Sequence, residues 1–221
     1  MHAQSETGTP VVWPMFFAYP HDPATNSLQH QYFYGPSILV APVTDVNSTS
    51  SEVYLPDDIF YDFYTHEAIR GTGDWLQLPE VPYTSIPLFY KGGSIVAQRS
   101  QSANTTAELR RRNFAVFIAP GLDGTACGDL YLDDGVSIEQ EASSWVHFFY
   151  DRDGRFSMSG SFGYDSGVVV DRVVVLGGDG AGDGGDECMN EKQAQISASG
   201  MSAGVAREVC VPLTQAYEVV L

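Results

Sequence analysis

Basic residues are scarce in this sequence. It holds 11 Lys and Arg against 28 Asp and Glu, which gives a formal net charge of −17 at pH 7. A surface of that sign repels nucleic-acid phosphates and anionic lipid headgroups, so we expect no nucleic-acid partner and no membrane partner. A continuous apolar run of ~18 residues, the minimum for a membrane-spanning helix, is also missing. The acidic composition suits a soluble extracellular protein.

Cysteine is scarce as well. The chain has only Cys127, Cys188 and Cys210, and none of them forms a C-x-x-C pair, which argues against a structural zinc site. We expect neither a metal nor a cofactor. This count allows one disulfide. Cys188 and Cys210 would close a short segment, but spacing alone leaves the pairing open.

No convincing catalytic constellation is found. The sequence contains no P-loop and no H-E-x-x-H. Asp133 and Asp134 are adjacent at the end of an expected strand, so their side chains diverge to opposite faces and suit a turn better than an acid–base pair. Asp57 and Asp58 are interpreted as a simple turn, and residues 177–186, rich in Gly and Asp, as a solvated loop rather than a calcium loop. We therefore assign no catalytic residue.

The chain does contain a series of apolar and aromatic runs separated by turn residues. Aromatic residues make up 12% of the chain, and this usage favours strands over helices. Runs at a spacing of about 8–12 residues predict antiparallel sandwich structure, and an Asp-Gly turn near residues 151–154 predicts a hairpin. The predicted strands are residues 37–43, 51–56, 59–64, 74–78, 85–90, 94–97, 113–119, 128–132, 145–150, 155–162, 168–176, 195–199 and 205–221.

Two segments depart from this pattern. Residues 10–19 are apolar almost throughout, which predicts a strand buried on both faces, as in a parallel sheet or a barrel. No βα repeats follow it, so we expect its partner strands to lie outside this chain. Residues 99–107 are polar and without pattern, which predicts a linker.

Two N-glycosylation sequons begin at Asn47 and Asn104. Both lie in Ser/Thr-rich stretches that are predicted to be loops, as a glycosylated asparagine requires. They indicate an extracellular or secretory-pathway protein. Met1 leads directly into polar residues without a signal peptide, so we expect the natural N-terminus to lie upstream.

An aromatic cluster lies in the first predicted β unit. Its members are Tyr61, Phe63, Tyr64, Trp75 and Tyr83. Such rings either stack on sugar faces or fill the core of a sandwich, and the core interpretation is preferred.

Six segments carry a resemblance to a known family. They are residues 8–22 (GTPVVWPMFFAYPHD), 31–43 (QYFYGPSILVAPV), 53–56 (VYLP), 61–64 (YDFY), 86–95 (IPLFYKGGSI) and 130–135 (LYLDDG). In order and spacing they resemble glycoside hydrolase family 31, particularly its fungal α-glucosidases, over about residues 8–140.

The resemblance implies a mainly β fold, in which the end of a (β/α)8 barrel is followed by two antiparallel β-sandwich domains. Residues 1–36 would be the remnant of the last βα unit of the barrel. Residues 37–100 would form the proximal C-terminal sandwich, and residues 101–221 the distal C-terminal β domain. Tyr19 would lie near the barrel rim, where the substrate binds.

The resemblance also implies a function for the intact protein. That function is hydrolysis of terminal α-linked glucose in an α-glucan or maltooligosaccharide substrate, with two aspartates from barrel strands that this chain lacks. The missing N-terminal catalytic barrel would be its partner, and the chain alone is predicted to be inactive. An α-xylosidase is the nearest variant. The alternatives are a non-catalytic carbohydrate-binding or structural β-sandwich module, and an inert truncated product.

Overall fold

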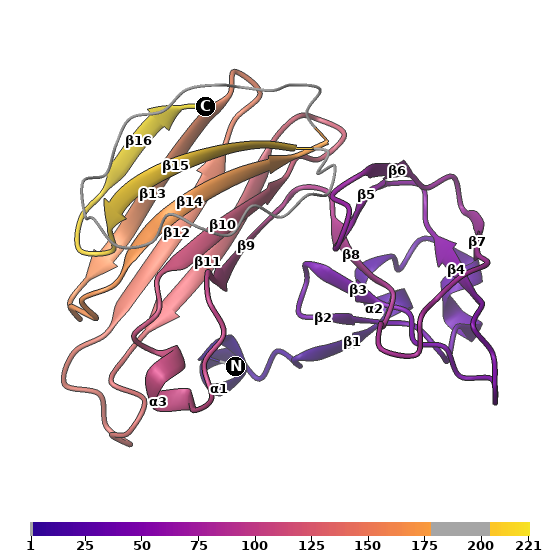
Figure 1. Ribbon diagram of the computed structural model, residues 1–221, viewed down its shortest axis with the longest axis horizontal. Helices are drawn as coiled ribbons and strands as arrows, with labels where there is room; N and C mark the ends of the chain where they lie inside the picture. The colour runs from indigo at the N-terminus through magenta and orange to yellow at the C-terminus, as the bar shows by residue number, and fades with distance from the viewer. Residues whose placement is uncertain (1, 178–203) are drawn as a thin grey trace.

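The computed structural model describes residues 2–177 and 204–221, and strands dominate it (Figure 1). One lobe holds a six-stranded sheet and a two-stranded ribbon, and the other holds an eight-stranded sheet, which confirms the predicted mainly β fold. The helices are short: α1 (His2–Thr7), α2 (Met15–Ala18), the 3-10 helix η1 (Pro23–Ser27) and α3 (Thr106–Leu109). Within the described ranges no helix has the length and apolar character needed to cross a bilayer.

The first lobe packs its antiparallel sheet against the ribbon. In sheet order the strands are β1 (Val12–Pro14), β2 (Tyr32–Tyr34), β3 (Ile38–Val40), β8 (Leu88–Lys91), β5 (Ile59–Asp62) and β6 (Ala68–Arg70), and the ribbon is β4 (Ser51–Leu55) with β7 (Asp74–Leu78). Apolar side chains from both layers form one core, with Phe33, Phe60 and Phe89 at most 1% exposed. This burial of large rings is the main stabilising contribution in the lobe.

The apolar run at residues 10–19 does not form the predicted strand. It divides into β1, which pairs antiparallel with β2 at the sheet edge, and the helix α2. Pro14 ends the strand because proline has no N–H to donate to a ladder. Met15 is buried, whereas Phe16 and Phe17 are 45% and 52% exposed. The prediction of a parallel strand buried on both faces was therefore wrong.

The second lobe is one strongly curled sheet. In sheet order its strands are β15 (Gly204–Pro212), β14 (Val169–Leu176), β10 (Phe114–Ala119), β9 (Ser94–Arg99), β11 (Ala126–Leu132), β12 (Ser144–Tyr150), β13 (Arg155–Phe162) and β16 (Tyr217–Val220). Its core combines residues from strands near both ends of the sheet, such as Val211 of β15 and Phe156 of β13. Two pairs of neighbouring strands run parallel, β10 with β14 and β9 with β11. The prediction of purely antiparallel sheets was therefore wrong here.

The change from one sheet to the other falls at Gly92 and Gly93. They connect β8 of the first sheet to β9 of the second, so the division predicted between residues 100 and 101 does not coincide with it. A Cβ on Gly92 would lie 2.3 Å from Ile59 Cγ2, and Gly93 has φ +80°. A side chain would therefore clash at Gly92 and would be strained by the backbone angle at Gly93, so each position favours glycine for its own reason. The predicted strand at 195–199 and residues 178–186 of the Gly/Asp-rich loop lie outside the described residues.

The two sheets share a hydrophobic seam. Tyr61 and Tyr90 of the first sheet pack against Ala115, Phe117 and other residues of the second. Tyr90 stacks on Phe117 with ring centroids 5.9 Å apart, and the Tyr61 hydroxyl donates a hydrogen bond of 2.8 Å to the carbonyl of Pro120. The lobes are thus joined by packed side chains as well as by the chain.

His66 makes the seam sensitive to pH. Its ring lies 5.4 Å from that of Phe117, and burial lowers the pKa of the imidazole. A lowered pKa means that the folded state binds fewer protons than the unfolded chain, whose histidine has a pKa near ~6.5. This contribution to stability is therefore complete above that value and is lost as the pH falls through the folded-state pKa.

We predict that His66→Asn reduces the acid sensitivity of the protein. Asn tolerates the φ of +63° at this position. Urea midpoints measured at pH 7.5 and pH 5 should differ less in the variant than in the parent. His21→Asn, at an exposed histidine, is the matched control and should leave the difference unchanged. An equal acid shift in the parent and His66→Asn would contradict the role of His66.

Candidate functional site

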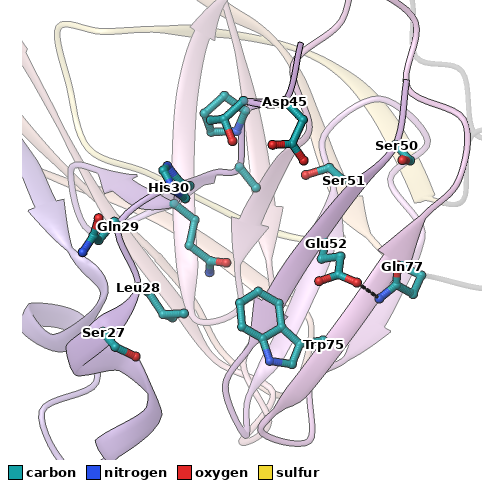
Figure 2. A pocket seen from close by; sticks show the side chains of 14 residues that line it. Ser27, Leu28, Gln29, His30, Asp45, Ser50, Ser51, Glu52, Trp75 and Gln77 are labelled. Carbon is teal, nitrogen blue, oxygen red and sulfur yellow. Dashed lines mark hydrogen bonds between the residues drawn. The ribbon is translucent and has the colours of Figure 1, made fainter. Parts of the chain in front are cut away.

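A pocket of about 570 Å³ lies between the β4–β7 ribbon and the segment that follows η1 (Figure 2). Figure 2 shows Leu28 and His30 on one side of it and Trp75, Glu52 and Gln77 on the other. This volume falls within the range of small-molecule sites.

The strand period creates the ribbon side of this pocket. Successive residues of a strand face opposite ways, and here Val53 and Leu76, which are paired across the ribbon, belong to the first lobe's core. Their neighbours Glu52, Trp75 and Gln77 line the pocket on the other face. One amphipathic ribbon thus supplies both a core layer and a binding surface.

Trp75 packs against Tyr54, its cross-strand neighbour in the ribbon. Its ring meets Tyr54 edge to face at a centroid distance of 5.6 Å and remains 49% exposed. The Tyr54 hydroxyl donates a 2.7 Å hydrogen bond to Asp22 Oδ2. Burial, with this hydrogen bond, raises the pKa of Tyr54 to about 12. The protonated hydroxyl is the donor that fixes the Tyr54 ring beside Trp75.

Glu52 and Gln77 form a joined polar pair beside Trp75. They are opposite each other across the ribbon, and Gln77 Nε2 donates to Glu52 Oε1 at 2.6 Å. This bond fixes the amide orientation. It leaves the second carboxylate oxygen of Glu52 and the carbonyl oxygen of Gln77 available as acceptors.

The Gln31 side chain hydrogen-bonds β4 of the ribbon and so fixes the segment after η1, which forms the other side of the pocket. This side chain is 6% exposed, donates to the Tyr54 carbonyl at 2.8 Å and accepts from the Tyr54 N–H at 2.9 Å. The Gln31 amide thus pairs with the backbone of β4 as a neighbouring strand would. This pairing keeps the residues just before Gln31 beside the pocket.

The pocket has no Lys or Arg in its lining. Its ionisable side chains are Asp45, Glu52 and His30. Acceptor oxygens beside an exposed indole suit hydroxyl-rich neutral ligands, whereas an anion would be repelled. Within the described part of the chain, no group of three or more His, Cys, Asp or Glu side chains is placed to hold a metal ion.

The adjacent aspartates Asp133 and Asp134 form a turn. Asp134 accepts hydrogen bonds from the N–H groups of Val136 and Ser137 at 2.9 and 3.0 Å. Hydrogen bonds from Ser137 and Val136 lower the pKa of Asp134. Asp133 pairs with Arg110 at 3.0 Å. A general acid needs a raised pKa, so these contacts suit a turn.

Tyr19 is anchored in the first lobe. Its hydroxyl donates a 2.8 Å hydrogen bond to Asp58 Oδ2, which also lies 3.4 Å from Lys91 Nζ. Burial, reinforced by Asp58, raises the pKa of Tyr19. Tyr19 also lines a second cavity of about 460 Å³. Asp58, predicted as a simple turn residue, thus links α2 to β5 and β8.

The remaining predicted residues are dispersed. Asn47 and Asn104 are both exposed. Cys210 is exposed on β15, whereas Cys188 lies outside the described residues, so their pairing stays a prediction. The aromatic cluster divides: Tyr61 is buried in the seam, but Trp75 and Tyr83 are 49% and 77% exposed.

Sequence reasoning missed most of the pocket. Glu52, Gln77 and Gln31 carried no motif. The available signal was the alternation in residues 74–78 (DWLQL), which places Trp75 and Gln77 on the face opposite Leu76. Which segment would cover that face could not be inferred from local pattern.

Fold and pocket together define a β-rich region that has a polar pocket and no recognisable catalytic pair in its described residues. Residues 8–96 match the model of the glycosyl hydrolase family 31 C-terminal domain. Residues 8–96 therefore belong to the C-terminal domain of glycosyl hydrolase family 31.

Curated relatives agree with this assignment. The chain is 52% identical over 176 residues to the probable alpha/beta-glucosidase agdC of Neosartorya fischeri, covering 80% of this chain and 20% of the relative. It is 34% identical over 190 residues to an alpha-glucosidase of Hordeum vulgare, covering 80% and 21%. The chain thus spans about a fifth of the length of the curated relatives it matches.

Solved structures show the same fold. The glucosidase II alpha subunit, in a Glc1Man2-bound form, matches 99% of this chain and 26% of its own length, with a TM-score of 0.79 and 25% identity. The GH31 alpha-xylosidase of Xanthomonas citri matches 100% of this chain and 22% of its own, with a TM-score of 0.69 and 21% identity. At that identity the second match shows the fold alone.

Proposed function

We propose that this chain is the C-terminal region of an α-glucosidase, and that the whole protein releases terminal α-linked glucose from an α-glucan or maltooligosaccharide. The observation that carries this proposal is the identity of about half over 176 residues with a relative named as an alpha/beta-glucosidase. An α-xylosidase activity is the nearest alternative, but the α-xylosidase match rests on fold alone.

In this proposal the chain supports catalysis without performing it. Residues 1–36 adjoin the catalytic barrel, the rest of the first lobe up to Gly92 is the proximal β unit, and the second lobe from Gly93 onward is the distal β unit. A surface for the barrel is available on β1, α2 and β2, where Val12, Phe17 and Tyr34 are 53%, 52% and 50% exposed. Apolar groups gathered at one edge are typical of an interdomain contact.

A chimera tests the proposal. The corresponding fifth of the Neosartorya fischeri relative is replaced by this chain, and glucose release from maltose and from aryl α-glucoside is measured at acidic pH. We expect the chimera to keep glucosidase activity within about tenfold of its parent, and the isolated 221-residue chain to show no turnover above the buffer rate. A folded but inactive chimera, or turnover that co-purifies with the isolated chain, would contradict the proposal.

The same chimera tests the proposed position of Tyr19 near the barrel rim. Tyr19→Phe should change KM for maltose, and Tyr83→Phe is the matched control. An unchanged KM in Tyr19→Phe would place this residue away from the substrate.

We also propose that the protein passes through the secretory pathway and carries N-glycans at Asn47 and Asn104. Expression in a fungal secretory host should give a protein whose mass falls on endoglycosidase treatment. Removal of either asparagine by Asn→Gln should remove part of that mass difference, and an unchanged mass would contradict glycosylation at that position.

A further inference from the structure

We infer that the pocket beside Trp75 binds a short neutral oligosaccharide without hydrolysing it, with one sugar ring stacked on the indole. This inference rests on the pocket alone and does not depend on the enzymatic proposal. Three observations carry it: a fixed and exposed ring, a joined acceptor pair next to that ring, and the charge of the lining.

The exposed indole of Trp75 can stack on the flat apolar face of a sugar ring. Sugar rings present C–H groups on one face and hydroxyls at the rim, so they stack on aromatic rings and leave their polar edge for hydrogen bonds. Trp75 is half exposed, and Tyr54 supports it from the edge. A ring that is already immobilised loses little conformational entropy on binding.

The polar pair lies where the rim of a stacked sugar would be. Trp75 and Gln77 are two residues apart on β7 and therefore share a face. Gln77 and Glu52 are joined by their 2.6 Å hydrogen bond, so two acceptors are held side by side. Hydroxyls are donors that such a pair recognises, and the carboxylate makes the stronger, charge-assisted bond.

No hydrogen bond from the indole N–H of Trp75 to any described residue is present, so that donor remains available to a ligand hydroxyl. Asp45 and His30 border the same cavity from other segments. A volume of about 570 Å³ accommodates more than one sugar ring.

The charge of the pocket selects among hydroxyl-rich ligands. Two carboxylates without Lys or Arg in the lining, on a chain of net charge −17, disfavour phosphorylated, sulfated or uronic sugars. The polar lining also argues against an apolar peptide, which needs a hydrophobic groove. A neutral oligosaccharide satisfies both conditions.

Titration of the full chain with maltotriose and cellotriose tests the inference, with calorimetry and tryptophan fluorescence as readouts. The protein is prepared without N-glycans, since Asn47 lies in the loop between the pocket residues Asp45 and Ser50. We expect millimolar or tighter binding of at least one trisaccharide. Trp75→Ala should weaken it at least tenfold, and Gln77→Ala several-fold.

Tyr64→Ala is the matched control, because Tyr64 is exposed but lies outside the pocket lining. It should leave the Kd unchanged. Thermal unfolding verifies that each variant is folded, and loss of binding in the exposed Gln77→Ala variant supports the site even if Trp75→Ala unfolds.

Three results would overturn the inference: no binding of either sugar at tens of millimolar, equal binding by a folded Trp75→Ala variant, or preferential binding of a sulfated trisaccharide. None of these readouts requires catalysis, so the outcome is independent of whether the chimera hydrolyses maltose.

Discussion

Truncation of Tyr90 to alanine should lower the free energy of unfolding by about 3–5 kcal/mol, the cost of removing a large ring from a well-packed core. Tyr90 is 1% exposed in the seam and stacks on Phe63, with ring centroids 4.9 Å apart, as well as on Phe117. Its hydroxyl also accepts a hydrogen bond from Gln98 of β9. The variant therefore loses packing on both sides of the seam.

Urea unfolding followed by tryptophan fluorescence measures this loss and shows whether the lobes unfold together. Trp13 and Trp75 lie in the first lobe and Trp145 in the second, so single-tryptophan variants report each lobe separately. We expect Tyr90→Ala to move both transitions. Tyr64→Ala, at a neighbouring ring that is 56% exposed, should move neither by more than about 1 kcal/mol.

A transition that shifts only for the first-lobe tryptophans would show that the lobes are thermodynamically independent. The seam would then be a contact between separate domains rather than a shared core. Coincident shifts would instead support a single cooperative unit.

Replacement of Gln31 by leucine should cost about 2–4 kcal/mol. Leucine keeps most of the volume but leaves the N–H and C=O of Tyr54 without their partners, and each buried unsatisfied group costs roughly 1–3 kcal/mol. Both hydrogen bonds have ordinary lengths, 2.8 and 2.9 Å, and Gln31 is 6% exposed. The loss is therefore larger than that of an ordinary surface amide.

Gln29→Leu provides the matched control, since Gln29 is two residues away and exposed. Its unfolding free energy should stay within about 0.5 kcal/mol of the parent. Gln31→Leu should also weaken trisaccharide binding, because the wall that Gln31 attaches to β4 is released. Equal stabilities of the two variants would show that water satisfies the Tyr54 backbone, and that Gln31 does not hold the wall.

The hairpin at residues 151–154 was predictable because its determinants are local. Asp151 Oδ1 accepts hydrogen bonds from the N–H groups of Asp153 and Arg155, and Gly154 has φ +81°. β12 and β13 pair antiparallel from Ser144 with Phe162 to Tyr150 with Phe156, as the Asp-Gly turn predicted. Turn chemistry and strand alternation act over a few residues, so they can be read along the chain.

The sequence by itself therefore determined the mainly β character, most strand positions, the family resemblance and the negative charge that disfavours anionic ligands. The tertiary structure decided which strands are neighbours, that two pairs run parallel, and that the sheets change at Gly92. It also decided that residues 27–31 cover Trp75 and form a pocket. These features depend on contacts between residues far apart in sequence, such as Gln31 with Tyr54. Such contacts are chosen by the packing of the whole fold, and no local pattern encodes them.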